Sequence, residues 1–362
     1  MSLKCGFVGL TNSGKTTLFN CMLGGKAHTT SGVPKTNLGM VNVPDERLKT
    51  LEKFQKTERL VPAVVEIVDI PGLTKGSTQN DSMGARFLAD IRQTDAIIHI
   101  IRCFDDPNVP HIETSIDPVR DKEIVDLELQ FRDMESVEKK IHKYEKLVKI
   151  GEKDAKKGLE VLMTVKKHLE EFQPVRTAHV DKEDRRFLQD LFLLTDKPVL
   201  YVCNVDSDSA VDGNKYTRAF AESIAGDNAS ILIIAAGLEA EIAELESADD
   251  RTAFLEDYGL HEPGVNKLIR ACYSLLKLKT FFTVGPKEIR AWTIHEGMTA
   301  PQSAGVIHSD LERGFIRAEV MKYADYTTLG SEHACREAGK LMIEGKNYIV
   351  HDGDILHIRF NV

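Results

Sequence analysis

The sequence predicts an α/β protein: a doubly wound sheet, an inserted α-helical hairpin and a small α+β domain towards the C-terminus. Three observations support this. Short apolar runs alternate with helical segments, helix-type spacing takes over in one long stretch, and strands then follow in quick succession. Most of the runs lack polar alternation, which is typical of strands covered on both faces. They are Cys5–Val8, Val64–Val68, Ile97–Ile101, Val199–Cys203 and Ile231–Ala235.

Length, charge and cysteine usage narrow the class of protein. A chain of 362 residues is long enough for two or three domains. A net charge of −9 argues against a protein that coats nucleic acid. The six cysteines form no Cys-x-x-Cys pair, as expected in a reducing compartment. No apolar stretch approaches bilayer length, and the first strand leaves no room for a signal peptide. We therefore expect a cytoplasmic monomer that binds neither membranes nor DNA.

The inserted segment has the spacing of two packed helices. Apolar residues recur at intervals of three and four over 134–148 and again over 159–172, and Gly151 and Gly158 bracket the joint between the two seams. Residues 139–167 contain ten lysines against four acids. Two interpretations remain open: a solvated helix pair, or a projecting arm that touches RNA phosphates.

The C-terminal part reads as a separate small domain. One helix is expected at Ala334–Glu344 and a hairpin turn at His351–Asp354. We expect a discontinuous nucleotide-binding domain at 1–122 and 196–278, a helical domain at 123–195 and a third domain at 279–362. The expected C-terminal strands are Phe281–Val284, Ile289–Ile294, Ile316–Met321, Tyr348–Val350 and Ile355–Phe360.

A phosphate-binding loop follows the first strand. Gly9–Thr16 fits Gly-x-x-x-x-Gly-Lys-Ser/Thr and opens a helix, the context that this pattern requires. Lys15 is expected to reach the β- and γ-phosphates, and the Thr16 hydroxyl to bind Mg²⁺. The backbone N–H groups that would surround the β-phosphate belong to Asn12, Ser13, Gly14, Lys15, Thr16 and Thr17.

Two further segments complete a GTPase-type site. Asp69 ends a strand and is placed to hold Mg²⁺, while the N–H of Gly72 can meet a γ-phosphate. Leu73 stands where Ras-like enzymes carry the glutamine that orients the attacking water, so hydrolysis must be slow or another group must act. Of the candidates Thr29, Thr30 and Thr36, we choose Thr36 as the mobile Mg²⁺ ligand.

Base recognition is expected after a later strand. GTPases use Asn-Lys-x-Asp, whereas this chain has Asn204-Val205-Asp206-Ser207. The serine cannot accept the two guanine hydrogen bonds, so guanine specificity is weakened. We expect Asn204 to buttress the phosphate loop or contact the base edge, with Val205 and Asp206 beside it. Backbone amides of 235–237 would assist.

With these residues placed, the chain resembles the Obg-like ATPase (YchF) family over its whole length. The resemblance implies a C-terminal TGS-type β-grasp domain and ATP hydrolysis, in preference or in addition to GTP. It also implies association with the ribosome and its RNA. Two segments depart from the family pattern: Pro34–Asn37 in the first switch, and Ser207. The family-like stretches are Lys4–Gly9, Phe87–Ile91, Arg102–Phe104, Glu239–Leu245, Glu262–Gly264, Glu288–Ile294, Gly314–Ala318 and Asp352–Asp354.

The resemblance also bears on catalysis. A hydrophobic residue at the position of Leu73 is a family trait, and the family's mobile, water-orienting histidine matches His111. A surface-loop role for His111 stays open. By analogy with other GTPases that lack the glutamine, Asn12 is expected to hold a K⁺ ion in addition to the Mg²⁺.

Three functions fit these residues to different degrees. The leading one is a slow ATPase that acts as a nucleotide-dependent switch on the ribosome. The second is a nucleotide-gated adaptor that binds ATP or GTP and RNA or ribosomes without significant hydrolysis. The third, a small-molecule kinase, is disfavoured because no arginine-rich lid is evident and the Asp69–Gly72 segment is typical of switch proteins.

Overall fold

The computed structural model describes residues 3–24, 36–72, 82–227 and 229–361. The chain divides into two compact units, Met1–Gly39 with Glu66–Leu268, and Met40–Val65 with Ile269–Val362. Among the described helices, none is long and apolar enough to cross a bilayer.

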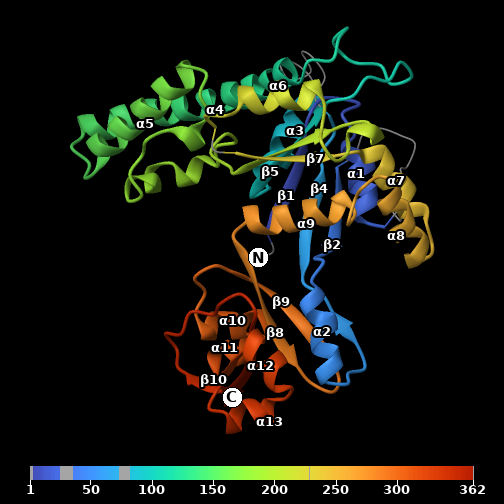
Figure 1. Ribbon diagram of the computed structural model, residues 1–362. Helices are drawn as coiled ribbons and strands as arrows, with labels where there is room; N and C mark the ends of the chain where they lie inside the picture. The colour runs from blue at the N-terminus through green and yellow to red at the C-terminus, as the bar shows by residue number, and fades with distance from the viewer. Residues whose placement is uncertain (1–2, 25–35, 73–81, 228, 362) are drawn as a thin grey trace. The chain divides into compact units, whose positions relative to one another are not determined.

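The first unit is built on a six-stranded sheet in the order β2-β4-β1-β5-β6-β7 (Figure 1). Its strand pairs β1–β4, β1–β5, β5–β6 and β6–β7 are parallel, which confirms the predicted α/β class. β5 and β6 are buried along their whole length, so they appear in the sequence as continuous apolar runs. The strands are β1 (Lys4–Val8), β2 (Asn37–Asn42), β4 (Val64–Asp69), β5 (Ala96–Arg102), β6 (Val199–Asn204) and β7 (Ser230–Ile234).

Helices surround this sheet, and short 3₁₀ turns lie at Val175–Thr177, Asp184–Phe187, Gln189–Leu191 and Ser207–Ser209. The helix α9 continues across the boundary into the second unit. The helices are α1 (Lys15–Met22), α3 (Ser82–Arg92), α4 (Pro118–Lys149), α5 (Ala155–Glu170), α6 (Lys215–Ser223), α7 (Ala236–Glu244), α8 (Ala248–Asp257) and α9 (Gly264–Leu275).

The predicted helical hairpin is confirmed, and its first helix is longer than the seam suggested. α4 runs unbroken for 32 residues, from a first turn capped by Asp117. Its N-terminal half supplies Val125 to the core of the sheet, and its C-terminal half supplies Val137 to a separate core shared with α5. The distal half of α4 and α5 extend beyond the edge of the sheet (Figure 1). The expected domain boundary after residue 122 thus lies inside a continuous helix.

Of the two glycines expected at the hairpin joint, only Gly151 lies there, with φ 72° between α4 and α5. Gly158 lies inside α5, which corrects the prediction. A Cβ at Gly158 would come within 2.3 Å of the Tyr144 ring on α4, so this glycine allows the two helices to approach closely.

The second unit has its own six-stranded sheet in the order β11-β10-β12-β8-β9-β3. Pairs β8–β9, β10–β12 and β10–β11 are antiparallel, whereas β12–β8 and β3–β9 are parallel. Its elements are α2 (Glu46–Phe54), β3 (Leu60–Val61), β8 (Leu278–Val284), β9 (Ile289–His295), α10 (Ala300–Ile307), α11 (Ser309–Arg313), β10 (Phe315–Lys322), α12 (Tyr323–Leu329), α13 (Glu332–Glu337), β11 (Met342–Glu344) and β12 (Asp354–Phe360).

Two predictions for this unit were wrong. The helix expected at Ala334–Glu344 is α13, which ends at Glu337; Gly339 then has φ 71°, and the chain enters β11. The strand expected at Tyr348–Val350 is only an isolated bridge from Ile349 to Thr299. The turn before β12 is present, but it is not part of a hairpin with a strand at 348–350.

Candidate nucleotide site

The phosphate loop lies between β1 and α1, as expected. Asn12 and Gly14 both have positive φ angles, 62° and 98°. At Gly14 a side chain is also excluded by space, because a Cβ would lie 2.2 Å from the Asn204 amide nitrogen. The loop therefore turns tightly where its backbone N–H groups are needed, directly before the first turn of α1.

The Lys15 ammonium is held by the loop itself. Its Nζ donates to the carbonyl oxygens of Gly9 and Leu10 at 3.0 and 2.6 Å, and the residue is buried. Burial lowers the pKa of Lys15 to about 8, and the nearby charge of Asp69 partly opposes that shift. Both carbonyl oxygens are uncharged acceptors. A negatively charged phosphate oxygen binds an ammonium group more strongly and can therefore replace them.

Thr16 and Asp69 meet at the position expected for a magnesium ion. The Thr16 hydroxyl donates to Asp69 Oδ2 at 3.0 Å. Asp69 Oδ1 is buried and accepts no hydrogen bond from the part of the chain that the structure describes. Burial raises the pKa of Asp69, while the Thr16 bond, the Lys15 charge and the Asn37 side chain oppose it. A buried carboxylate oxygen without a donor, beside a hydroxyl, fits a hard cation such as Mg²⁺.

Gly72 comes directly against the phosphate loop. A Cβ there would lie 2.8 Å from Lys15 Nζ and 3.0 Å from the backbone of Thr11, so a side chain at this position would crowd the loop. The structure therefore brings Gly72, Lys15, Thr16 and Asp69 together. Leu73, and the alternative candidates Thr29 and Thr30, lie outside the described residues.

Thr36 is engaged elsewhere. Its hydroxyl hydrogen-bonds to the carboxylate of Asp90 on α3. A metal-binding role would require this bond to be given up. The sequence did not point to the neighbouring Asn37, whose side chain opposes the rise in the pKa of Asp69.

Asn204 is a buttress of the loop. Its amide donates to the Ser13 carbonyl at 2.9 Å and accepts from the N–H of Ala236 at 2.9 Å. Val205 is buried, and the Asp206 carboxylate accepts from the N–H and hydroxyl of Ser209. Of the predicted base-reading group, Asn204 thus joins the phosphate loop to α7, while Asp206 caps a 3₁₀ turn.

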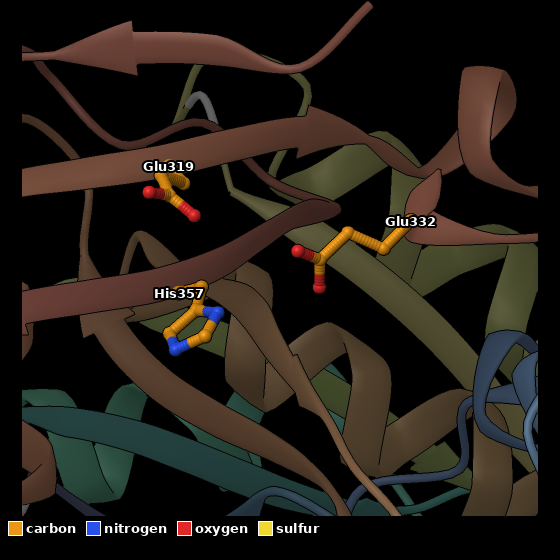
Figure 2. Close-up of side chains that lie close together, drawn as sticks. All are labelled: Glu319, Glu332 and His357. Carbon is orange, nitrogen blue, oxygen red and sulfur yellow. The ribbon is translucent and has the colours of Figure 1, made fainter. Parts of the chain in front are cut away.

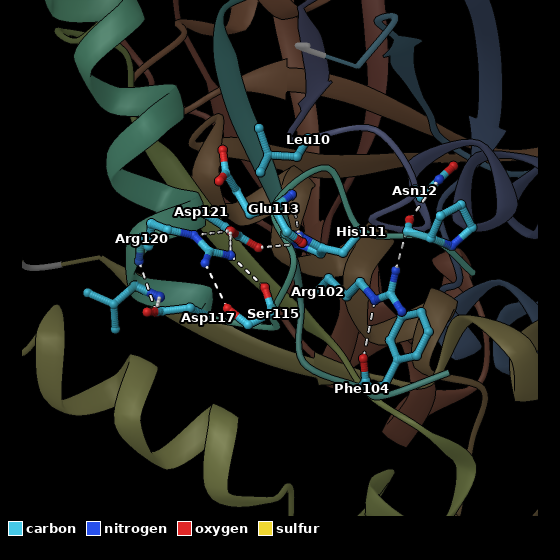
Figure 3. Close-up of polar contacts among 12 residues, drawn as sticks. Leu10, Asn12, Arg102, Phe104, His111, Glu113, Ser115, Asp117, Arg120 and Asp121 are labelled. Carbon is cyan, nitrogen blue, oxygen red and sulfur yellow. Dashed lines mark hydrogen bonds and ion pairs between the residues drawn. The ribbon is translucent and has the colours of Figure 1, made fainter. Parts of the chain in front are cut away.

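His111 lies on the loop between β5 and α4, beside the phosphate loop (Figure 3). The Asn12 amide donates to the carbonyl of neighbouring Pro110 at 3.0 Å. The Nε2 atom of His111 lies 2.8 Å from Asp121 Oδ2, and Nδ1 meets the Glu113 backbone N–H at 3.0 Å and its carbonyl oxygen at 2.8 Å. The ring is therefore close to the site with both nitrogens occupied.

Two functional candidates escaped the sequence reasoning, His99 and Asp121. Together with Ser13 and His111 they line a cavity of about 10 Å³ under the phosphate loop, close to the size of one water. His99 Nε2 and Ser13 Oγ are buried and have no hydrogen-bond partner among the described residues. Burial lowers the pKa of His99 to about 3, so its imidazole is neutral. One signal was present: His99 is the only polar residue within the apolar run 97–101.

Known proteins resemble this chain along its whole length. A protein of Bacillus subtilis (strain 168) called ribosome-binding ATPase YchF is 44% identical over 367 residues, covering 100% of both chains. The protein of the same name from Escherichia coli O157:H7 is 41% identical over 371 residues, again with 100% of both covered. The chain belongs to the YchF family.

Two family models and a solved structure agree with this placement. Residues 4–143 match the model MMR_HSR1, described as 50S ribosome-binding GTPase. Residues 278–361 match the model YchF-GTPase_C, described as a protein of unknown function (DUF933). The structure of the Schizosaccharomyces pombe YchF GTPase has a TM-score of 0.89 and 33% identity, and covers 99% of this chain and 98% of that one.

Among the described residues of the second unit of this YchF-family chain, Glu319, Glu332 and His357 form a cluster of metal-ligand side chains (Figure 2). Arg359 donates two hydrogen bonds of 3.1 Å to Glu319, and Arg336 lies 3.2 Å from Glu332. Guanidinium groups therefore already neutralise both carboxylates and would repel a cation. We interpret the cluster as a structural ion-pair network.

Proposed function

We propose that this chain binds ATP with Mg²⁺, hydrolyses it slowly, accepts GTP as a second substrate and acts as a nucleotide-dependent switch on the ribosome. The convergence of Lys15, Thr16, Asp69 and Gly72 on one loop carries the nucleotide part of the proposal. The names of the relatives, ribosome-binding ATPase, support the choice of ATP and of the ribosome.

Each residue has a defined role in this proposal. Lys15 leaves the Gly9 and Leu10 carbonyls to hold the β- and γ-phosphates, while the N–H groups of 12–17 surround the β-phosphate. Thr16, Asp69 and, once released from Asp90, Thr36 hold the Mg²⁺, which when bound neutralises phosphate charge.

The water-orienting role falls to His111 in this proposal. A leucine at position 73 has no hydrogen-bonding group, whereas an imidazole can both donate and accept. The closeness of His111 to the phosphate loop supports the role. The Asn12 amide nitrogen donates to Pro110, so its oxygen is the atom that a K⁺ ion would use.

ATP is the preferred nucleotide in this proposal. A guanine base needs a carboxylate that accepts from N1–H and N2–H₂, and the Asp206 carboxylate is already committed to Ser209. Ser207 offers only a hydroxyl. Asn204, Val205 and the amides of 235–237 remain to line the base site.

The remaining parts of the assignment are also proposals. We assign residues 123–195 to a helical domain, 279–362 to a TGS-like β-grasp domain, and 1–122 with 196–278 to the nucleotide-binding domain, from which residues 40–65 pass into the second compact unit. We further infer a cytoplasmic monomer that contacts ribosomal RNA.

A turnover assay tests the proposal. Phosphate release from ATP and from GTP would be measured in K⁺ and in Na⁺ buffer, with and without 70S ribosomes. We expect faster release from ATP, stimulation by ribosomes and by K⁺, and none in Lys15→Ala. A lack of stimulation together with a failure to co-sediment with ribosomes would overturn the ribosomal part.

One observation favours the alternative of a non-hydrolysing adaptor. With both ring nitrogens of His111 occupied, the described conformation has no histidine free to orient water. Protein that binds Mg-ATP but releases no phosphate, even on ribosomes, would establish the adaptor and exclude the switch ATPase.

A further inference from the structure

His111 contacts the first turn of α4. The Asp121 carboxylate accepts from His111 Nε2 at 2.8 Å, and both side chains are almost fully buried, with exposures of 5% and 8%. Whichever group of Glu113 meets Nδ1, a short contact from Nε2 to a carboxylate requires a hydrogen on Nε2. In this conformation Nε2 is therefore a donor that is already used.

Asp121 is itself held in place (Figure 3). Arg120 donates to Asp121 Oδ1 through Nε at 3.2 Å and through Nη2 at 2.8 Å, which leaves Oδ2 for His111. The same guanidinium donates to the backbone oxygen of Ser115 at 2.7 Å. The carboxylate is thus fixed relative to α4 and relative to the loop that carries His111.

α4 joins this contact to the lysine-rich hairpin. Asp121 lies in its first turn, and the helix then continues for about 42 Å to Lys149, at 1.5 Å per residue. It has no break, and Asp133, at its middle, accepts from the backbone of Leu194 and Thr195 at 2.7 Å each. A displacement at the distal end is therefore carried by a stiff element to the Asp121 carboxylate.

We propose that Asp121 is a latch: it holds His111 with Nε2 occupied until a partner on the lysine-rich end of the hairpin shifts α4 and withdraws the carboxylate. Asp121 is a positioning residue that acts through His111. The latch rests on the proposed catalytic role of His111, and it assigns to the hairpin the control of turnover in addition to attachment.

Kinetics of Asp121→Ala test the latch. Basal kcat for ATP should rise roughly tenfold, the factor that one charge-assisted hydrogen bond represents. The KM should change little, and the ribosome-saturated kcat should match wild type, so stimulation by ribosomes shrinks. Asp126→Ala removes a carboxylate five residues later on α4, paired with Lys122 at 2.6 Å, and is the matched control for general damage.

The double variant His111→Ala with Asp121→Ala separates the latch from a structural effect. If Asp121 acts through His111, the double variant should turn over like His111→Ala alone. A rate gain that survives without His111, or an equal loss of kcat with and without ribosomes, would overturn the latch.

An NMR measurement keeps the latch testable if His111 proves not to be catalytic. In ¹⁵N-histidine-labelled protein, the His111 ring should show a protected Nε2–H that disappears in Asp121→Ala and persists in Asp126→Ala. An unchanged His111 signal would refute the latch. A released ring combined with wild-type turnover in His111→Ala would instead refute the catalytic role proposed above.

Discussion

At the scale of single residues, Lys15 and Thr16 of the nucleotide site make hydrogen bonds that a ligand must displace, whereas Asp69 Oδ1 has no partner among the described residues. Lys15 donates hydrogen bonds to two carbonyl oxygens, and the Thr16 hydroxyl donates one to Asp69. Each of these bonds joins groups that a phosphate or a metal ion would bind more strongly. The free site is therefore ordered before the nucleotide arrives, and its electrostatics set the conditions for binding.

Nucleotide affinity should fall above about pH 8. Burial lowers the pKa of Lys15 to about 8, so the free protein loses this cation as the pH rises past that value, while phosphate binds the charged form. The dissociation constant should rise by up to about tenfold per pH unit between pH 8 and 9.5. A fluorescent ATP analogue titrated from pH 6.5 to 9.5 measures this, and a constant affinity would contradict it.

Loss of the fold does not explain such a decline. Because the folded pKa of Lys15 lies below its unfolded value, the unfolded chain binds more protons here between pH 8 and 10.5. The contribution of Lys15 to stability therefore rises over this interval. Lys15→Arg supplies the control: its guanidinium does not titrate, so any affinity that it retains should be independent of pH.

Base preference should depend on residue 207. In Ser207→Asp a carboxylate can accept both guanine donors, so the ratio of GTP to ATP affinity should rise by about tenfold or more. Competition between the two nucleotides at fixed Mg²⁺ measures the ratio. Ser207→Ala removes the hydroxyl without adding charge and should leave the ratio unchanged. An unaltered ratio in Ser207→Asp would mean that the base is read elsewhere.

At the scale of elements, the strands predicted correctly are those that form a continuous run of apolar residues in the sequence. The strands β1, β4, β5, β6 and β7 were confirmed because strands inside a parallel sheet appear as apolar runs, even where, as in β7, most residues are only half-buried. The edge strand β2 was missed although residues 38–41 form a short apolar stretch; Leu38 and Met40 are exposed, so this strand is not covered on both faces as the predicted strands are. α2 and the two-residue β3 were missed as well.

The same distinction applies to the site. The phosphate loop is a contiguous pattern and could be read directly, with Asp69 and Gly72 following from the ends of strands. The contact of His111 with Asp121 depends on how the loop after β5 folds back, and no spacing rule predicts that. Gly158 was misread because a glycine inside a helix and one at a joint look alike in sequence; only its 2.3 Å approach to Tyr144 distinguishes them.

Gly158→Ala should weaken the hairpin. Alanine favours a helix by about 1 kcal/mol over glycine, but the added methyl would meet the Tyr144 ring, which packs edge-on against Phe187. We expect a net loss of about 1–2 kcal/mol, because overpacking in a packed interior exceeds the propensity gain. Thermal unfolding followed by circular dichroism measures it.

The control is Gly237→Ala in α7, where no atom beyond its chain neighbours and its own helix backbone lies within 4 Å of the added Cβ. That variant should be neutral or stabilised by a few tenths of a kcal/mol. Equal changes in the two variants would show that helix propensity alone, and not contact with Tyr144, controls the effect.

At the scale of the whole molecule, the chain is acidic overall but carries one strongly basic segment. The chain carries −9 overall, yet residues 139–167 hold ten lysines and four acids. Several of these lysines, including Lys143, Lys146 and Lys153, are exposed on the hairpin. A locally basic element on an acidic protein directs association with a polyanion to one surface, while like charge elsewhere opposes non-specific contact.

Ribosome association should therefore be sensitive to salt and should depend on the hairpin. A triple variant with Lys143→Glu, Lys146→Glu and Lys153→Glu should weaken binding. The plot of log affinity against log salt should also become less steep, by roughly one unit of slope for each lysine that contacts a phosphate. Basal ATP turnover should stay unchanged, because these residues lie outside the nucleotide site. Co-sedimentation with ribosomes at 50–300 mM KCl provides the measurement.

The matched control reverses three exposed lysines of the second unit, Lys49, Lys53 and Lys56, and so makes the same change in net charge. If the hairpin directs binding, this control should keep the wild-type salt slope. Equal weakening in both triple variants would mean that net charge, and not the hairpin, governs association. A wild-type slope in the hairpin variant would mean that the hairpin does not contact the ribosome. The Asp121 latch would then have no bound partner to shift α4.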